Sequence, residues 1–265
     1  AIFANLSLVF AARVDAKSPA IPVDEIRAQI KAEMDRQKIP GLTMAVAVDG
    51  KIVFDDGFGL ADVENRVAAK RKTVFRTASI AKPMTSTLIM QLAEKRNLDL
   101  DADVHQYYPT YPEKRWPVTS RKLLGHLGGV RHYKSREEAS STRHFFNTKS
   151  TIELFADDPL SHEPGSKFLY SSFGYNLLGA VAEGVGGKPF VTQLKQSVWS
   201  VAKMKNTYVD DTFVIIPNRA SGYQRFSPQQ IAQFPTGHTY RAGKLYNSSL
   251  HDTSMKIPGG GLVST

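Results

Sequence analysis

The chain has 265 residues, 42% of them apolar and 22% charged, which is typical of a globular protein and excludes disordered, collagen-like and coiled-coil classes. Its formal net charge is +9, but the basic residues are scattered in short runs such as Lys70-Arg71-Lys72, so we expect no nucleic-acid partner. It contains no cysteine, and this excludes disulfides, thiol catalysis and cysteine-ligated metal centres.

The N-terminal stretch AIFANLSLVFAA is an apolar run that is too short to span a bilayer. Together with the small residues that follow, it resembles the apolar core of a secretory signal. We therefore expect residues 1–20 to be a signal-peptide remnant or a disordered tail, and the protein to be secreted or periplasmic. No other stretch of the sequence is apolar enough to predict a membrane span.

The next part of the chain predicts a helix followed by a hairpin. Apolar residues recur at four-residue spacing over residues 23–37, which indicates an amphipathic helix, and Pro40-Gly41 should end it. Two β-rich runs, residues 42–48 and 51–58, then flank Asp49-Gly50, a pair that suits a two-residue hairpin turn. We expect the two runs to be neighbouring antiparallel strands.

The middle of the chain is expected to be helical. An apolar stripe over residues 84–96 predicts a helix that starts near Ser79, and a stronger stripe over 174–185 predicts one that Gly186-Gly187 should stop. Short helices are expected near residues 120–126 and 150–155, and the last fifty residues look irregular and β-rich. The predicted fold is mixed α/β: an antiparallel sheet flanked by helices, with a helical subdomain.

Ser79 and Lys82 stand three apart where an extended stretch gives way to the first central helix, so both side chains should lie on one helix face. A serine hydroxyl needs an adjacent base to become a nucleophile, and a desolvated lysine can be that base. The spacing alone is weak because Ser200 and Lys203 repeat it, but no comparable helix follows Ser200. We assign the second pair to chance.

Tyr170 precedes the strongest helical stripe, where a loop could direct its hydroxyl into a cleft. A tyrosine at such a place can move a proton between nucleophile and leaving group, although it can equally be an aromatic residue that packs the helix entrance. His126 and His132 are six apart with no carboxylate pair at metal-ligand spacing, so we expect a structural or surface role and no metal.

The Ser-x-x-Lys motif at 79–82 and the segment YSSFGYNLLG at 170–179 together resemble the serine β-lactamase and penicillin-binding-protein superfamily. The similarity is greatest to the class C-like branch and, within it, to mitochondrial serine β-lactamase-like proteins and their bacterial relatives, through GLADVENRV, HLGGVRHY and GGGLVST. It implies a serine hydrolase domain over residues 21–265, with Ser79 as the acylated nucleophile and Lys82 and Tyr170 as its proton-handling pair.

The chain departs from the pattern of that branch at two points. Ser172 occupies the place of the usual asparagine, so efficient β-lactam hydrolysis is not expected, whereas Ser172 can still hydrogen-bond Lys82 or a substrate amide. The third motif, Lys-Thr-Gly or His-x-Gly on a strand beyond GGGLVST, is missing, so we expect a C-terminally incomplete copy. We therefore expect the apolar residues of the hairpin and first helix to be unusually exposed.

The resulting expectation is a serine acyl hydrolase that acts through a Ser79 acyl-enzyme on a small ester, amide or peptide, with esterase or peptidase activity ranked above β-lactamase activity and no cofactor. The alternative is a non-catalytic protein that keeps the fold for peptide or cell-wall binding, or for assembly. The sequence gives no indication of the oligomeric state.

Overall fold

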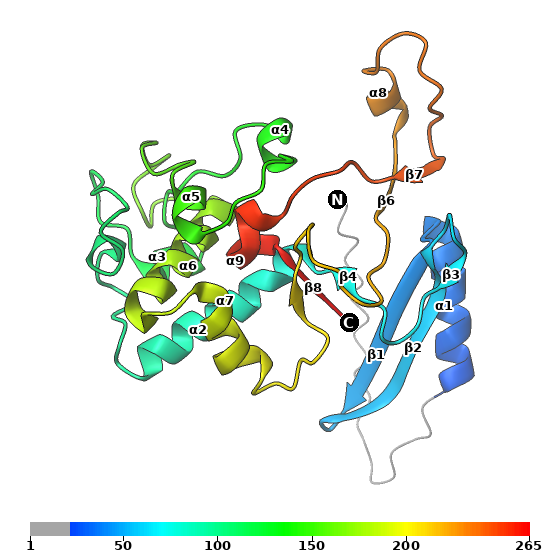
Figure 1. The fold of residues 1–265 in the computed structure, drawn as a ribbon, viewed down its shortest axis with the longest axis horizontal. Coiled ribbons are helices and arrows are strands. Elements are labelled where there is room, and N and C mark those ends of the chain that lie inside the picture. Colours follow the sequence, from blue (N-terminus) through cyan, green and yellow to red (C-terminus); the bar gives the residue numbers. More distant parts are fainter. Residues whose placement is uncertain (1–21) are drawn as a thin grey trace.

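The computed structural model describes residues 22–265, so the predicted signal remnant at 1–20 lies outside the described residues. A helical region lies on one side and a hairpin backed by a helix lies on the other, and a narrow arm of residues 223–247 projects beyond the hairpin (Figure 1). The last described strand runs between the two parts (Figure 1). The expected mixed α/β fold is confirmed.

The described elements have the following bounds. The α-helices are α1 Val23–Gln37, α2 Ala81–Glu94, α3 Ser120–Leu124, α4 Arg136–Ala139, α5 Thr148–Ile152, α6 Ser172–Gly186, α7 Phe190–Leu194, α8 Pro228–Ile231 and α9 Ile257–Gly260. The strands are β1 Gly41–Val48, β2 Lys51–Asp62, β3 Val67–Ala68, β4 Phe75–Arg76, β5 Tyr208–Val209, β6 Tyr223–Arg225, β7 Leu245–Asn247 and β8 Leu262–Ser264. Short 3-10 turns are η1 Ala78–Ile80, η2 Val104–Gln106 and η4 Ser254–Lys256, and one π-helical turn covers Lys195–Trp199.

The predicted hairpin is confirmed: β1 and β2 are antiparallel, with Val48 opposite Lys51. Asp49 and Gly50 both have positive φ, 49° and 73°, which is the conformation of the two-residue turn that matches strand twist. The predicted exposure of the hairpin is also confirmed, since its outer face shows apolar side chains to solvent, with Ile52 67% exposed.

The apolar face of helix α1 is covered, so the prediction that it would be exposed is wrong. Ile30 and Met34 are buried in one cluster with Phe54 and Phe58 of β2. These two phenylalanines are four apart on a strand and therefore lie on one face of the hairpin, where their rings can receive the helix. The hairpin thus has one face packed by α1 and one face exposed.

Within residues 22–265 the strands form three small antiparallel sheets rather than the single sheet expected from the sequence, in the orders β1-β2-β3, β4-β8-β5 and β6-β7. The middle sheet is made of strands two or three residues long, with β8 paired on both sides. Because β4 leads directly into η1 and α2, this sheet sets the position at which the helical region begins.

Helix α6 is the centre of the helical region, and its residues from Ser172 to Ala182 are buried. It packs against α2, α5 and α9, which surround it in Figure 1. The predicted stop is confirmed, because Gly187 ends the helix at a positive φ of 61°, a conformation that favours glycine. None of the helices within residues 22–265 is long and apolar enough to cross a membrane.

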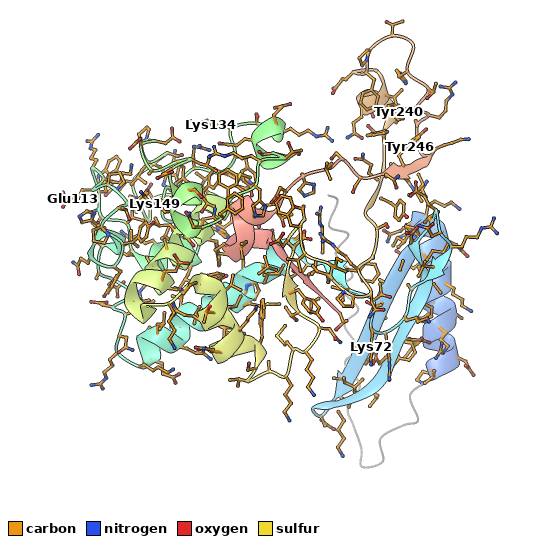
Figure 2. All side chains as sticks on the ribbon, in the orientation of Figure 1. Lys72, Glu113, Lys134, Lys149, Tyr240 and Tyr246 are labelled. Carbon is orange, nitrogen blue, oxygen red and sulfur yellow. The ribbon has the colours of Figure 1, made fainter. Side chains whose placement is uncertain are left out.

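The arm between β6 and β7 carries its own aromatic cluster. The rings of Phe226, Phe234, Tyr240 and Tyr246 lie within 5.5 Å of one another in adjacent pairs, and the tyrosines are labelled on the arm in Figure 2. These contacts hold together a segment that has little regular secondary structure.

Candidate active site

Ser79 lies in a tight turn between strand β4 and helix α2, as predicted. The residue before it, Ala78, has a φ of 46°, a left-handed conformation that costs energy for a residue with a Cβ. Strand β8 holds the turn at the preceding residue, because the backbone N–H and the hydroxyl of Thr77 both donate to the carbonyl oxygen of Leu262 at 3.0 Å. Strand β8 therefore fixes the entry to the Ser79 turn.

Lys82 follows Ser79 by one helical turn, and its Nζ lies 3.3 Å from Ser79 Oγ. Only 5% of Lys82 is exposed. Burial lowers the pKa of Lys82 from its ordinary 10.5, and the neighbouring Tyr170 hydroxyl offsets part of that decrease. Burial therefore makes the neutral amine, the form that can accept a proton from serine, more accessible in Lys82 than in a free lysine.

Tyr170 reaches the same serine from the loop before α6. Its hydroxyl lies 2.5 Å from Ser79 Oγ, and its ring lies 4.7 Å from Lys82 Nζ. Ser171 caps the helix that follows, its Oγ accepting from Gly174 N at 2.9 Å. The helix start thus holds Tyr170 in place, while 37% of the residue remains open to solvent.

Two further groups fix Lys82 Nζ. It donates to the carbonyl oxygen of Gly259 at 2.6 Å and to Ser172 Oγ at 3.4 Å. With Ser79 this makes three acceptors, which matches the three N–H bonds of an ammonium group. A neutral amine keeps two N–H bonds to donate and can accept a hydrogen bond from the hydroxyl of Ser79 or Ser172 with its lone pair. These contacts can therefore accommodate either protonation state.

Ser172 was predicted at the site from the sequence, whereas Gly259 was not. The contact is made by a backbone oxygen, and only the glycine run at 259–261 indicated that a close approach occurs here. A Cβ on Gly259 would lie 3.1 Å from the carbonyl oxygen of Ser172, closer than most real contacts. Glycine therefore allows α9 to lie close against the start of α6 at Ser172.

His126 and His132 are adjacent to the site rather than on the surface. His126 Nδ1 lies 3.2 Å from the backbone N of Ser171, and His132 Nδ1 lies 3.2 Å from that of Ser172. Burial, together with the charge of Lys82, lowers the pKa of His126 to about 4 and also lowers that of His132. Residues 22–265 contain no group of three or more histidines and carboxylates that could hold a metal ion.

The second Ser-x-x-Lys lies away from this cluster. Ser200 ends the π-helical turn of residues 195–199, and Lys203 has a positive φ of 56°, so the pair follows a helix rather than starting one. Both residues are exposed. The α7 helix and the π turn were not predicted.

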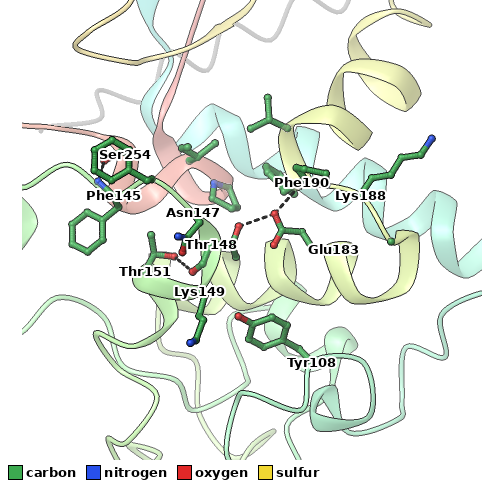
Figure 3. Close-up of a pocket in the computed structure, with 16 residues that line it drawn as sticks. Tyr108, Phe145, Asn147, Thr148, Lys149, Thr151, Glu183, Lys188, Phe190 and Ser254 are labelled. Atoms are coloured by element: carbon green, nitrogen blue, oxygen red, sulfur yellow. Dashed lines mark hydrogen bonds between the residues drawn. The ribbon is translucent and has the colours of Figure 1, made fainter.

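A cavity of about 550 Å³ lies beside α9 and is shown in Figure 3. It is lined by Ser254 and Pro258 but by none of the four predicted site residues. Its carboxylate, Glu183, accepts from the Thr148 hydroxyl and from Phe190 N, both at 2.8 Å, and the second of these bonds caps α7. The cavity is therefore distinct from the Ser79 cluster.

Comparisons with known proteins agree on one fold. A family model described as Beta-lactamase matches residues 26–265. The human mitochondrial serine beta-lactamase-like protein LACTB is 32% identical over an alignment of 300 positions, gaps included, which covers 87% of this chain and 52% of that protein. D-amino acid amidase from Ochrobactrum anthropi SV3 superposes with a TM-score of 0.73 at 22% identity, over 92% of this chain and 67% of that one. EstCE1, a hydrolase with promiscuous acyltransferase activity, gives 0.72 at 22% identity, over 91% and 68%.

The chain spans about half the length of the curated relatives that it matches. The family match nevertheless covers nearly all the described residues, including the Ser79 turn and the Tyr170 loop. The fold expected from the two motifs is confirmed by the structural neighbours. The chain therefore belongs to the Beta-lactamase family, within the serine β-lactamase and penicillin-binding-protein superfamily of serine hydrolases.

Proposed function

We propose that this protein is an acyl hydrolase in which Ser79 forms an acyl-enzyme with an ester, amide or peptide substrate. The observation that carries the proposal is that Ser79 Oγ lies within hydrogen-bond reach of two proton-handling groups, the Tyr170 hydroxyl at 2.5 Å and Lys82 Nζ at 3.3 Å. A nucleophile beside a base that is itself oriented by further contacts is the arrangement that covalent catalysis requires.

The reaction would begin with proton transfer from Ser79 Oγ to neutral Lys82, directly or through Tyr170, as Oγ attacks the substrate carbonyl carbon. The tetrahedral intermediate collapses when the bond to the leaving group breaks and Tyr170 passes a proton to the departing oxygen or nitrogen. Water then attacks the acyl-enzyme, giving up its proton to the same pair, and Ser79 regains its proton as the acid product leaves.

Esterase or peptidase activity ranks above β-lactamase activity in this proposal. The single hydroxyl of Ser172 is shorter than the family's usual asparagine and lacks its separate amide donor and carbonyl acceptor, and Ser172 Oγ already accepts from Lys82. Two proteins of the same fold support a proposal that includes both amide and ester substrates. One is a D-amino acid amidase, and the other is a hydrolase with promiscuous acyltransferase activity.

A substrate panel tests the proposal: short-chain aryl esters, D- and L-aminoacyl anilides, and nitrocefin, each assayed with wild type and with Ser79→Ala. We expect measurable ester or anilide hydrolysis that Ser79→Ala abolishes, with nitrocefin turned over more slowly. Fast nitrocefin turnover with negligible ester hydrolysis would overturn the ranking. Saturable binding of a peptide without any turnover by the folded protein would favour the non-catalytic alternative.

A further inference from the structure

The loop 126–133 is hydrogen-bonded along its length to the segment that carries Tyr170. Leu169 N donates to the carbonyl oxygen of His126 at 2.8 Å, and Ser171 Oγ donates to that of Arg131 at 2.7 Å. The two histidine Nδ1 atoms accept from the next two backbone N–H groups, those of Ser171 and Ser172. The backbone on both sides of Tyr170 is therefore anchored to this one loop.

We propose that His126 and His132 are positioning residues that act as hydrogen-bond acceptors and hold the Tyr170 hydroxyl against Ser79. The rings also enclose the tyrosine directly: the His126 ring centroid lies 4.4 Å from that of Tyr170, and the His132 centroid lies 5.5 Å from it, edge to face. The expected effect of the two histidines on catalysis rests on the proposed function. Their contacts with the Tyr170 segment do not depend on it.

The geometry specifies one tautomer for each ring. An Nδ1 atom that accepts from a backbone N–H carries no proton, so the proton of the neutral ring must be on Nε2. A protonated ring would turn an Nδ1–H towards a backbone N–H, and the hydrogen bond would be lost. Both rings therefore support the Tyr170 segment only in the neutral form.

The surroundings of both rings favour that neutral form. His126 faces Tyr170 and Tyr175 in ring contact, and it lies near Lys82 and His132. The charged groups around His132 are the cations of Lys82, Lys256 and Arg131 and the single carboxylate of Glu138. Burial and this excess of positive charge lower the pKa of each ring.

Arg131 ties the loop to the helical region. The guanidinium of Arg131 bonds both Glu138 and Asp158, and it also donates to the carbonyl oxygen of Leu154 at 2.8 Å. The side chain of Arg131 is only 12% exposed, so this network is shielded from solvent. His132, the next residue, is thereby fixed relative to the helical region.

Paired substitutions test the proposal, because an asparagine Oδ1 can take the place of Nδ1 as acceptor and a leucine cannot. In the complete protein we expect His126→Leu and His132→Leu each to slow acylation of Ser79 by a fluorophosphonate by about 10- to 100-fold, the usual cost of misplacing a reacting group by about 1 Å. His126→Asn and His132→Asn should restore most of that rate. His238→Leu, on the arm, is the matched control and should leave the rate unchanged.

Two NMR measurements separate this proposal from the proposed function. Long-range ¹H–¹⁵N spectra should show both rings of wild type with the proton on Nε2 at neutral pH, and amide exchange at Ser171 and Ser172 should be faster in the leucine variants than in the asparagine variants. If wild type reacts with no acyl probe, the proposed function is wrong. The spectra still show whether the two histidines accept hydrogen bonds from the backbone N–H groups of Ser171 and Ser172. Protons on Nδ1, or equal exchange and equal rates in folded leucine and asparagine variants, would overturn the proposal.

Discussion

The side chain of Lys82 donates a 2.6 Å hydrogen bond to the carbonyl oxygen of Gly259, a residue 177 positions further along the chain. The bond joins helix α2, which carries Lys82 and directly follows the Ser79 turn, to helix α9, which precedes the strand that holds that turn. The orientation of the proposed base therefore depends on a backbone atom in the last described helix.

Gly259→Ala should lower kcat/KM by up to about 10-fold by displacing the acceptor of Lys82, less than the loss that a 1 Å misplacement can cause. The added Cβ would lie 3.1 Å from the carbonyl oxygen of Ser172, so the two groups must move apart by a few tenths of an ångström. Gly260→Ala is the matched control, because its Cβ would make ordinary contacts of 3.5 Å or more. Ester kinetics of both variants check the prediction, and equal activities would contradict it.

Lys82→Ala should abolish acylation to the level of the Ser79→Ala variant, because within residues 22–265 the side-chain hydrogen-bond partners of Ser79 Oγ are Lys82 Nζ and the Tyr170 hydroxyl. Without Lys82, Tyr170 would lack the amine that accepts the proton in the proposed mechanism. Lys203→Ala should leave the rate within about twofold of wild type, as surface substitutions usually do. Stopped-flow burst measurements with an aryl ester provide the comparison. Loss of activity in Lys203→Ala with Lys82→Ala unaffected would mean that the wrong serine has been chosen.

Tyr170→Phe should slow acylation by about 10² to 10⁴, the usual contribution of general acid–base catalysis. The variant loses only a hydroxyl on a residue that is 37% exposed, so the melting temperature should change little. Differential scanning calorimetry beside the kinetic assay separates loss of chemistry from loss of fold. A rate close to that of wild type would remove Tyr170 from the mechanism.

Folding stability should fall as the pH decreases from about 6.5 to about 4, in part because of His126. The pKa of this ring is lowered to about 4 in the folded protein, so the unfolded chain binds more protons in that window, and stability must rise with pH across it. The shift limits the contribution of His126 to the free energy of unfolding to at most about 3 kcal/mol, and solvent screening of this half-buried ring makes the contribution smaller. Urea unfolding of wild type and His126→Asn at several pH values should give a shallower slope for the variant, and identical slopes would contradict the assignment.

The sequence allowed Ser79, Lys82 and Tyr170 to be predicted because each belongs to a short motif at a helix start. The spacing alone was weak, since Ser200 and Lys203 repeat it, and the resemblance of the two motifs to the superfamily selected these three residues. The structure brings their side chains together. Helix α1 and the β1–β2 hairpin were predicted directly, since apolar periodicity and the Asp49-Gly50 turn are local signals.

The features that the sequence did not predict depend on contacts between distant segments. The Gly259 carbonyl is a backbone atom that any residue supplies, so no side-chain pattern marks it. The roles of His126 and His132 depend on which backbone N–H groups their rings meet, and this is set by packing of the 126–133 loop. Likewise, the exposure predicted for α1 was wrong because Phe54 and Phe58 happen to present one apolar face to it.

The most direct test of the central claim is to locate the covalent bond on Ser79. The complete protein is incubated with a fluorophosphonate, digested and mapped by mass spectrometry, with Ser79→Ala and Lys203→Ala treated in parallel. The account predicts one equivalent of label on the peptide that carries Ser79 in wild type and Lys203→Ala, and no label in Ser79→Ala. Label on another residue, or no label on folded wild-type protein, would contradict it.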